Sequence, residues 1–364
     1  MKIGVACGGT GGHIFPGLAT AEVLRARGHD IVLWLAGKDI ETQAVAHWEG
    51  PRHTVKSEGF QYGVSLRTVG TVVRLGKAFK TCRRLMAEDD PDVVLAMGSY
   101  ASAGPVYGAI RNRIPVVLHE ANVLPGRAIK TFASRATAVA ACFEETRHYL
   151  PKVNLEVTGM PIRRELHDAS RLIRGKSGRG EKFTLLLMGG SRGAAAINHL
   201  GAQGVVGLWR RRQDFKVIHL TGSKDESYVR GEYEKAGVDA EVHPFISDLT
   251  EIYSQTDLAI CRSGAATLAE LCAFAIPSLL VPYPHATHDH QTVNAQAVSR
   301  IRAADMIHER NLESAWLTEY LEGCMDASER QDEMRDALRA LYDIRPAEAL
   351  ADVVERSARG VAVT

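Results

Sequence analysis

Two glycine-rich turns, which begin half the chain apart, constrain the fold of this 364-residue protein more than any other feature. Residues 8–12 follow an apolar run at 3–7, and residues 189–193 follow a second apolar run at 183–188. Glycines after an apolar run are typical of the turn between a strand and a helix, where the missing Cβ and the free N–H groups of the helix admit an anion. The sequence therefore predicts two similar α/β halves, a geometry suited to holding a phosphorylated ligand.

Strand-like and helical stretches alternate in both halves, which indicates mainly parallel sheets. We place the domain boundary at residue 159, so that residues 1–159 form one α/β domain and residues 160–344 form the second. Pro346 precedes an apolar stripe typical of a helix, and we expect this terminal helix, at about 345–364, to pack back on the first domain. The expected strands are residues 2–7, 31–36, 92–97, 114–118 and 136–141 in the first half and residues 185–188, 216–220, 242–245, 258–261 and 278–281 in the second.

The composition is that of a globular protein, with 45% hydrophobic residues, 24% charged residues and a formal net charge of +1. This balance gives no sign of a surface for nucleic acid, so we expect no nucleic-acid partner. Six cysteines without a C-x-x-C pair indicate reduced thiols and a cytoplasmic setting. The sequence has no apolar segment of the length that a signal peptide or a membrane helix needs, which predicts a chain that is neither exported nor membrane-spanning.

His13 stands where the first glycine turn enters a helix. The positive end of the helix dipole lowers the pKa of a histidine at this position, so the imidazole stays neutral and can accept a proton from an attacking hydroxyl. We therefore interpret His13 as a general base; the alternative is a histidine that only caps or packs against the turn. Neither glycine turn matches the P-loop or the dinucleotide-binding fingerprint, which disfavours an NTPase and a dehydrogenase.

A second candidate site begins after the expected strand at 257–261. Ser263 is expected to be the N-cap of the next helix, and Gly264 permits close approach to the backbone. Ser263, Thr267 and Glu270 then share one face of that helix, which fits a diphosphate at the helix start and a ribose diol at Glu270. The alternative is an ordinary capped helix with Glu270 in solvent.

Glu120 and Asn122 follow another strand-like run. Open α/β sheets bind ligands at the carboxyl ends of their strands, so both side chains are candidates for a binding site. The alternative is that they only organise the loop that follows.

Histidine is frequent in residues 285–290, which raises the question of a metal site. No helix or strand period brings its three imidazoles into one coordination sphere, so no metal ligand is expected here. Gln291 and Asn294, at helical i, i+3 spacing, favour hydrogen bonds to sugar hydroxyls instead.

Residues 71–86 are basic and amphipathic, with five cations, no acid and apolar residues at helical spacing. Most segments of this kind are half-buried helices with solvated charges. Five cations on one helix also suit an anionic membrane surface, where each adds about 1 kcal/mol of attraction.

Taken together and in order, the motifs at residues 8–17, 119–122, 159–163, 189–194 and 261–265 resemble the MurG family of glycosyltransferases over essentially the whole chain. The resemblance implies an α/β GT-B fold, in which two Rossmann-like domains with mainly parallel sheets face a central cleft. The first domain would face the acceptor and the membrane, and the second would bind UDP-GlcNAc.

The same resemblance implies an inverting hexosyltransferase of cell-wall synthesis. Such an enzyme moves GlcNAc from UDP-GlcNAc to the C4 hydroxyl of MurNAc in lipid I, undecaprenyl-pyrophosphoryl-MurNAc-pentapeptide, and makes lipid II without an obligatory metal or another cofactor. It would lie peripherally on the cytoplasmic face of the inner membrane, with residues 71–86 at about the position of the family's membrane-docking patch.

Site residues follow from the resemblance position by position. His13 matches the candidate base. The positions that match contacts to UDP-GlcNAc are Thr10, Gly11, Gly12, Asn122, Arg163, Ser191, Ile246, Ala265, Ala266, Thr267, Leu268, Ala269, Glu270 and Gln291. Further candidates are Gly190, Ser263, Gly264, His290, Asn294, Tyr100 and Glu120.

Two alternatives stay open. One is a GT-B glycosyltransferase that uses another lipid or small-molecule acceptor, because the departures from the family pattern fall mainly within residues 60–110, including a longer loop at 98–105. The other is a non-catalytic nucleotide-sugar-binding protein, which would lose nothing when His13 is replaced by alanine.

Overall fold

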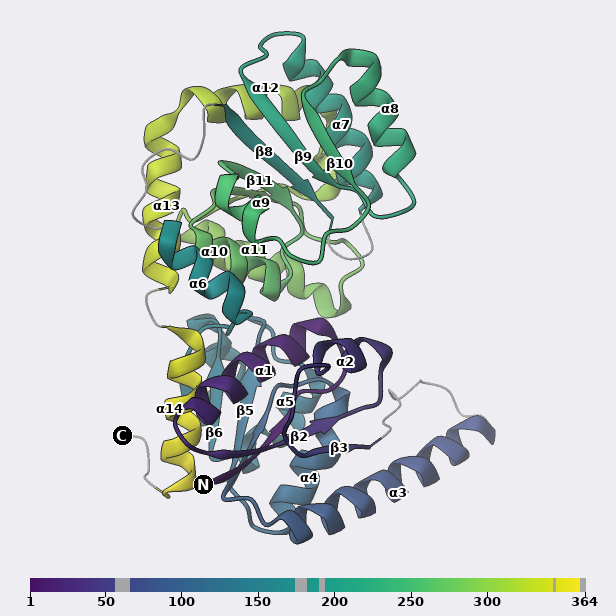
Figure 1. Ribbon diagram of the computed structural model, residues 1–364, viewed down its shortest axis with the longest axis vertical. Coiled ribbons are helices and arrows are strands. Elements are labelled where there is room, and N and C mark those ends of the chain that lie inside the picture. The colour runs from purple at the N-terminus through teal and green to yellow at the C-terminus, as the bar shows by residue number, and fades with distance from the viewer. Residues whose placement is uncertain (56–65, 174–181, 190–193, 343–344, 361–364) are drawn as a thin grey trace. The chain divides into compact units, whose positions relative to one another are not determined.

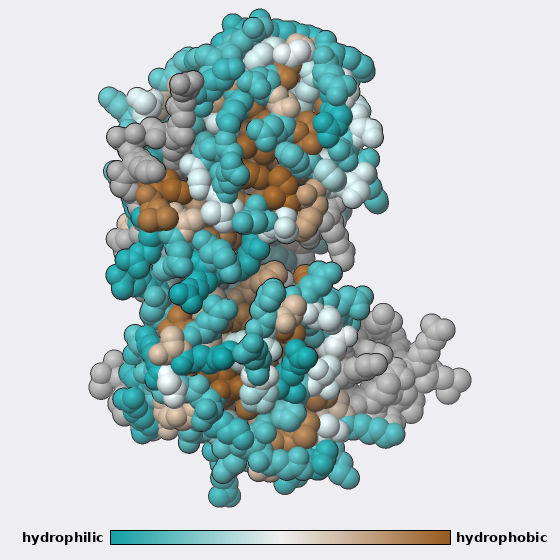
Figure 2. Space-filling view, viewed as in Figure 1, coloured by the Kyte–Doolittle hydropathy of each residue, from teal (hydrophilic) through white to brown (hydrophobic). Residues whose placement is uncertain are grey.

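The computed structural model describes residues 1–55, 66–173, 182–189, 194–342 and 345–360, without the side chains of residues 66–75. The chain divides into two compact units, residues 1–163 with 344–364 and residues 164–343 (Figure 1). Each unit has a parallel sheet of its own. On the face shown in Figure 2, hydrophilic residues cover most of the surface and hydrophobic residues show between them.

The first unit is built on a seven-stranded parallel sheet in the order β3-β2-β1-β4-β5-β6-β7. Its five inner strands overlap the runs that the sequence predicts. The edge strands β3 and β7 have three residues each. Because a hydrophobic period cannot be recognised over so few residues, the sequence does not predict them. The strands are β1 (Lys2–Ala6), β2 (Asp30–Leu35), β3 (Arg52–Thr54), β4 (Val93–Ala96), β5 (Val116–Glu120), β6 (Ala138–Ala141) and β7 (Leu155–Val157).

Helices cover both faces of this sheet. On one face α1 packs beside α14, and Leu350 and Val354 of α14 share a core cluster with Val5 of β1. On the other face α3 packs against α4, and Met86 of α3 joins Val94 of β4 in a second cluster. The helices are α1 (Gly11–Ala26), α2 (Asp39–Ala44), α3 (Leu66–Asp89), α4 (Ala103–Arg111), α5 (Arg127–Phe132) and α14 (Pro346–Ala358).

Gly17 explains how closely α1 approaches the sheet. A Cβ atom at this position would lie 2.4 Å from Cys7 Cβ and 3.0 Å from Met97 Cγ. Side chains do not approach one another so closely, so only glycine lets α1 rest on the carboxyl end of β1.

The second unit contains a six-stranded parallel sheet in the order β10-β9-β8-β11-β12-β13. β10 begins and ends two residues before the expected run at 242–245, which leaves Phe245 beyond the strand and 66% exposed. The sequence does not predict β13, which has two residues. The strands are β8 (Phe183–Met188), β9 (Phe215–Leu220), β10 (Ala240–His243), β11 (Leu258–Cys261), β12 (Ser278–Leu280) and β13 (Asp305–Met306).

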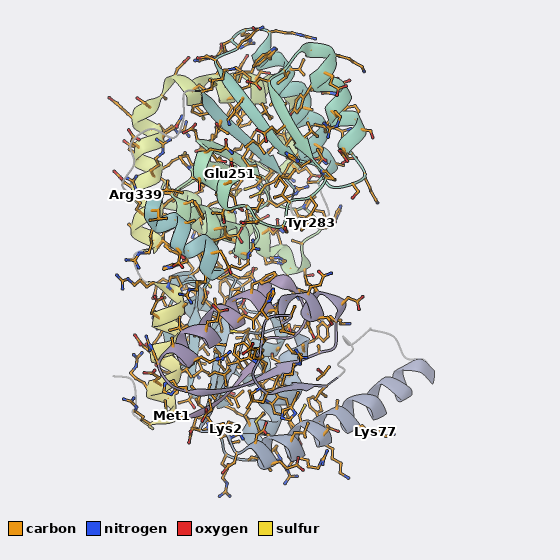
Figure 3. All side chains as sticks on the ribbon, viewed as in Figure 1. Met1, Lys2, Lys77, Glu251, Tyr283 and Arg339 are labelled. Carbon is orange, nitrogen blue, oxygen red and sulfur yellow. The ribbon has the colours of Figure 1, made fainter. Side chains whose placement is uncertain are left out.

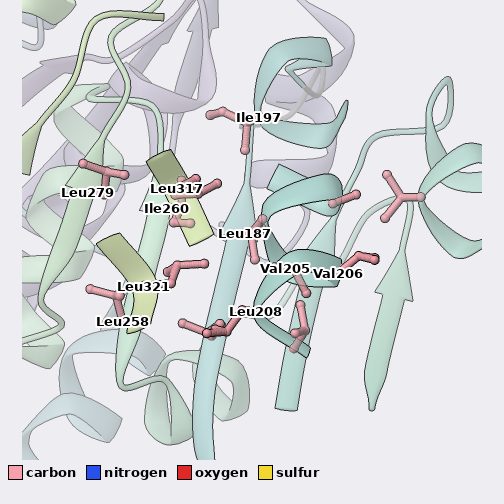
Figure 4. Close-up of a cluster of buried hydrophobic side chains, with 14 of the residues drawn as sticks. Leu187, Ile197, Val205, Val206, Leu208, Leu258, Ile260, Leu279, Leu317 and Leu321 are labelled. Carbon is pink, nitrogen blue, oxygen red and sulfur yellow. The ribbon is translucent and has the colours of Figure 1, made fainter. Parts of the chain in front are cut away.

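A hydrophobic core between this sheet and its helices holds the second unit together. Leu187, Leu258 and Ile260 of the central strands pack with Ile197 of α7 and Leu317 of α12 (Figure 4). Burying such a side chain contributes about 1.5–3 kcal/mol. The helices are α6 (Arg164–Ile173), α7 (Ala195–Trp209), α8 (Glu226–Ala236), α9 (Thr250–Gln255), α10 (Ala265–Phe274), α11 (His290–Arg300), α12 (Ser314–Asp326) and α13 (Ser328–Tyr342).

Both sheets share the strand order of the Rossmann fold, with the first strand of each unit next to the fourth. The α/β class and the two Rossmann-like domains that the sequence predicts are thereby confirmed. The strand order reverses between β1 and β4 in the first unit and between β8 and β11 in the second. Ligands of open α/β sheets bind outside the carboxyl ends of the strands at this point, so the described residues that follow these strands define one candidate region in each unit.

Candidate functional site

In the first unit, the loops after β1 and β4 meet at the reversal point of the sheet. Gly9, Gly98 and Ser99 have φ angles of 124°, 83° and 64°, in the left-handed region that favours glycine. The Ser99 hydroxyl donates a hydrogen bond to the carbonyl oxygen of Gly8 at 3.0 Å. This bond joins the glycine turn after β1 to the loop after β4.

His13 lies in the first turn of α1, directly after this glycine turn. Its Nδ1 is hydrogen-bonded to Thr10 Oγ1 at 2.8 Å, so Thr10 holds the ring. A Cβ atom at Gly98 would lie 3.8 Å from His13 Nε2, which places the imidazole beside the loop after β4. Burial lowers the pKa of His13 to about 4. The imidazole is therefore neutral near pH 7, a state that allows it to accept a proton.

Glu120 and Asn122 follow β5, the neighbour of β4. Glu120 is buried; its carboxylate accepts hydrogen bonds from the backbone N–H of Asn122 at 2.9 Å and of Gly126 at 2.7 Å. Burial raises the pKa of Glu120, and these bonds oppose the shift. For Glu120 the structure favours the alternative in which it organises the next loop. A ligand contact by Asn122 stays a prediction.

Other predicted residues of the first unit lie around the start of α1. Gly11 and Gly12 begin the helix. The guanidinium carbon of Arg163 lies 5.4 Å from the centre of the Phe15 ring, which brings Arg163 next to α1. Tyr100, in the short 3-10 turn Tyr100–Ser102 after β4, is 41% exposed.

Glu41 of α2 is a residue of this site that the sequence analysis misses. Glu41 is 2% exposed, and its carboxylate accepts hydrogen bonds from backbone N–H groups, including that of Gly9 in the glycine turn at 2.7 Å. The sequence gives no sign of the contact to Gly9, which is 32 residues away in the chain, although Glu41 also accepts the N–H of Lys38 at the start of α2. The only sequence signal for Glu41 is that it follows shortly after the expected strand at 31–36.

In the second unit, the residues that follow β11 also form a tightly bonded loop. Arg262 is buried, donates hydrogen bonds to the carbonyl oxygens of Val281 at 3.0 Å and Pro282 at 3.2 Å, and forms an ion pair with Glu309. These bonds fix the carboxyl end of β11, which leads into α10, against the carboxyl end of β12.

The prediction that Ser263 caps α10 is wrong. The N-cap residue is Gly264, and the Ser263 hydroxyl donates instead to the carbonyl oxygen of Gln291 at 2.8 Å. Because Gly264 has no side chain to cap the helix, none covers the first N–H groups of α10 from that position. At the predicted anion site, the N-cap residue therefore places no side chain over the start of the helix.

Along α10 the predicted positions differ in burial. Ala265, Ala266, Thr267, Ala269 and Glu270 are half-buried, and the Tyr253 hydroxyl of α9 donates to Glu270 Oε2 at 2.8 Å.

Leu268 is 3% exposed, so its side chain belongs to the core. Any ligand contact at Leu268 would have to come from its backbone.

The residues after β10 and β12 include the remaining candidates. Ile246 is half-buried, and Gln291 Oε1 accepts a hydrogen bond from the backbone N–H of Tyr283 at 2.9 Å. His290 Nδ1 lies 2.8 Å from the carbonyl oxygen of Thr287. Asn294 is fully buried, and its amide donates to the carbonyl oxygen of Ser263 at 3.3 Å. Its expected role as a sugar contact is therefore corrected to a hydrogen bond within the protein.

Two predicted positions, Gly190 and Ser191, lie outside the described residues. Within the part of the chain that the structure describes, no three His, Cys, Asp or Glu side chains are grouped so that they could hold a metal ion. None of the described helices is long and apolar enough to cross a bilayer.

Two Rossmann-like units define an α/β protein of the GT-B class. A crystal structure of MurG from Acinetobacter baumannii has the same fold, with a TM-score of 0.80 at 23% identity, over 98% of this chain and 99% of that chain. A putative UDP-N-acetylglucosamine 2-epimerase from Listeria monocytogenes also matches, with a TM-score of 0.71 at 12% identity, over 99% of this chain and 97% of that chain. The fold by itself therefore does not decide the reaction.

Residues 3–141 match the glycosyltransferase family 28 N-terminal domain and residues 184–349 match the C-terminal domain of that family. The chain is 36% identical over 355 residues to the UDP-N-acetylglucosamine--N-acetylmuramyl-(pentapeptide) pyrophosphoryl-undecaprenol N-acetylglucosamine transferase of Myxococcus xanthus (strain DK1622), which covers 97% of this chain and 92% of the relative. The chain therefore belongs to glycosyltransferase family 28. The resemblance indicated by its motifs is confirmed.

Proposed function

We propose that this enzyme transfers GlcNAc from UDP-GlcNAc to the C4 hydroxyl of MurNAc in lipid I and so makes lipid II for peptidoglycan synthesis. The name of the M. xanthus relative includes both compounds, UDP-N-acetylglucosamine and N-acetylmuramyl-(pentapeptide) pyrophosphoryl-undecaprenol. The observation that carries the proposal is the neutral imidazole of His13, held by Thr10 at the reversal point of a family 28 N-terminal domain.

The reaction is a single displacement at the anomeric carbon of GlcNAc. His13 accepts the proton of the acceptor hydroxyl while the hydroxyl oxygen forms a bond to that carbon. The bond from the anomeric carbon to the β-phosphate oxygen breaks, and UDP leaves with the electron pair. Attack from the face opposite the leaving group inverts the anomeric configuration. The proton on His13 then passes to solvent.

The second unit supplies the donor site in this proposal. The start of α10 faces the diphosphate with its backbone N–H groups, and the helix dipole stabilises the charge that develops on the leaving UDP. Glu270 accepts hydrogen bonds from the ribose hydroxyls. Ile246 and Gln291 contact the nucleotide and the sugar. Arg163 and the other family-matched positions of the first unit are further proposed contacts to UDP-GlcNAc.

The purified protein with UDP-GlcNAc radiolabelled in the sugar and a lipid I analogue in detergent tests this function. We expect radiolabel in the lipid product, with a rate that changes by less than about twofold when EDTA is added, because the helix N-terminus and not a metal stabilises the leaving group. Binding of UDP-GlcNAc without transfer to lipid I would point to another acceptor. Transfer to no acceptor at all, with intact binding, would point to a nucleotide-sugar-binding protein.

α3 includes the basic segment predicted to meet a membrane. In its described part, Cys82 is buried and the ring of Phe79 lies 4.9 Å from the ring of Tyr107 on α4, measured between centroids. A Cβ atom at Gly104 of α4 would lie 2.9 Å from Cys82 Sγ. Over these residues α4 covers the apolar stripe of α3, so the stripe cannot insert into a membrane.

The charged face of the same helix remains open. Lys77, Lys80, Arg83 and Arg84 are exposed, and Lys77 is marked on α3 in Figure 3. We therefore propose that α3 attaches the enzyme peripherally to the anionic cytoplasmic face of the inner membrane by electrostatic attraction. Such attachment would bring a water-soluble donor and a lipid-linked acceptor to the same surface.

Replacing Lys77 and Lys80 together by glutamine is expected to weaken binding to vesicles that contain anionic lipid by about thirtyfold, because each surface cation contributes about 1 kcal/mol. Vesicle sedimentation at low and moderate salt measures the effect, which salt should reduce. The matched control is the double replacement of Lys152 and Lys235, two exposed lysines elsewhere in the chain, by glutamine. Equal losses in both double variants would remove α3 as the attachment site.

A further inference from the structure

We propose that Glu41 is a positioning residue that holds the glycine turn at residues 8–12, and through it the His13 imidazole, in the geometry that transfer requires. The proposal rests on the proposed function in one respect, namely that His13 is the base. The hydrogen bonds of the Glu41 carboxylate go to backbone N–H groups of the protein itself.

The carboxylate of Glu41 joins two loops. Oε1 accepts the backbone N–H of Gly9 at 2.7 Å, and Oε2 accepts the N–H groups of Ala36 at 3.0 Å, Gly37 at 2.7 Å and Lys38 at 3.1 Å. The residue is only 2% exposed. A carboxylate so deeply buried is stable only when its oxygens are hydrogen-bonded, and here four backbone donors satisfy them.

The glycine turn is thereby held from two sides. Glu41 holds it from the side of β2, and the Ser99 hydroxyl, which donates to the carbonyl oxygen of Gly8 at 3.0 Å, holds it from the side of β4. The space for the turn is narrow, since a Cβ atom at Gly8 would lie 2.6 Å from the backbone nitrogen of Ala36. The two bonds hold the carbonyl and the N–H of one peptide unit, the one between Gly8 and Gly9, directly before Thr10.

Thr10 passes this constraint on to the imidazole. Its hydroxyl is bonded to His13 Nδ1 at 2.8 Å, and its carbonyl oxygen accepts the N–H of His13 at 2.9 Å. The position of the ring therefore depends on Thr10, and the position of Thr10 depends on the turn. The Gly9 N–H is occupied by Glu41, so this part of the turn serves to orient the residues that follow it, including His13.

Glu41→Gln is the main test. The amide keeps the size of the side chain but replaces one acceptor oxygen by an NH₂ group, which faces backbone donors and cannot bond to them. We expect kcat for GlcNAc transfer to fall by about tenfold or more, because small displacements of a catalytic group are costly, while KM for UDP-GlcNAc changes by less than about twofold. Ser99→Ala removes the second bond to the turn and is expected to lower kcat by about threefold.

The matched control is Glu156→Gln in the same unit. Glu156 lies on β7 and pairs with Arg356 of α14 at 2.5 Å, apart from the glycine turn in the fold. This variant should keep the kcat of the wild type within about twofold. A loss equal to that of Glu41→Gln would show that neutralising any carboxylate of this unit has the same effect and would overturn the proposal.

A spectroscopic readout separates positioning from stability and from the proposed function. The ¹⁵N chemical shifts of the His13 ring, assigned by their disappearance in His13→Ala, should change in Glu41→Gln and Ser99→Ala and stay the same in Glu156→Gln. Unchanged His13 shifts, or wild-type kcat, in a folded Glu41→Gln protein would overturn the proposal. If Glu41→Gln does not fold, the same two measurements on Ser99→Ala decide. If the wild type transfers no GlcNAc, the proposed function fails, whereas the ring shifts still test the positioning role.

Discussion

Replacing His13 by alanine is expected to lower kcat for GlcNAc transfer to lipid I by about 10² to 10⁴-fold, the usual contribution of a general base. Without the imidazole, the acceptor hydroxyl has to attack while it still carries its proton. Binding of UDP-GlcNAc should change little, because the proposed donor contacts of the second unit are untouched. Initial rates with saturating donor, and donor binding by calorimetry, measure the two quantities separately.

The pH profile of the wild type tests the same assignment. A general base is active only when it is unprotonated, and burial lowers the pKa of His13 to about 4. The imidazole therefore remains neutral as the pH falls through about 6.5, where an ordinary histidine becomes charged. We expect kcat/KM to stay flat from about pH 8 to about pH 5 and to decline below that.

The matched control for this prediction is His148→Ala, which removes an exposed histidine of the same unit. It should transfer GlcNAc at the rate of the wild type. Full activity of His13→Ala would exclude His13 as the base. An acid limb near pH 6.5 in the wild type would assign the essential base to a less buried group.

Replacing Glu270 by alanine is expected to raise KM for UDP-GlcNAc by about ten- to a hundredfold. A hydrogen bond to a charged group contributes about 1.5–3 kcal/mol, and the proposal gives Glu270 the ribose hydroxyls as donors. The Tyr253 hydroxyl already donates to Glu270 Oε2 at 2.8 Å and so fixes the orientation of the carboxylate. Removing such a preorganised acceptor weakens binding of the donor more than it slows the chemical step.

A substrate lacking the ribose 2′-hydroxyl makes this prediction specific. The wild type should bind 2′-deoxy-UDP-GlcNAc more weakly than UDP-GlcNAc, whereas Glu270→Ala should bind both alike, since the partner of the hydroxyl is gone. Glu251→Ala, at an exposed position of α9 that Figure 3 marks, is the control and should behave as the wild type. If Glu270→Ala still distinguishes the two donors, the ribose contact lies elsewhere.

Much of the fold was readable from the sequence because it depends on local patterns. The apolar runs before the two glycine turns became β1 and β8, and Pro346 begins α14. Family membership was also readable, because its motifs are short and occur in order along the chain. The roles of the individual site residues and of the two domains remain predictions.

Side-chain contacts between distant segments were not readable in this way. The sequence pattern favours Ser263 as a helix cap, but its hydroxyl bonds to the carbonyl oxygen of Gln291, 28 residues away. The stripe on α3 has the period of a membrane-facing helix, but its described part is covered by α4. In both cases the local pattern correctly indicates that the side chains require a polar or an apolar partner. It does not indicate which residue that partner is.

The sequence by itself determined two Rossmann-like units, the glycine turn at residues 8–12 and the position of His13 after it, because propensity and hydrophobic period act over a few residues. Only the tertiary structure decided what holds that turn. Glu41 lies 32 residues from Gly9, and Ser99 lies 91 residues from Gly8. The physical reason is that a buried polar group must find a hydrogen-bond partner, and the order of strands in the sheet determines which distant residues lie within reach.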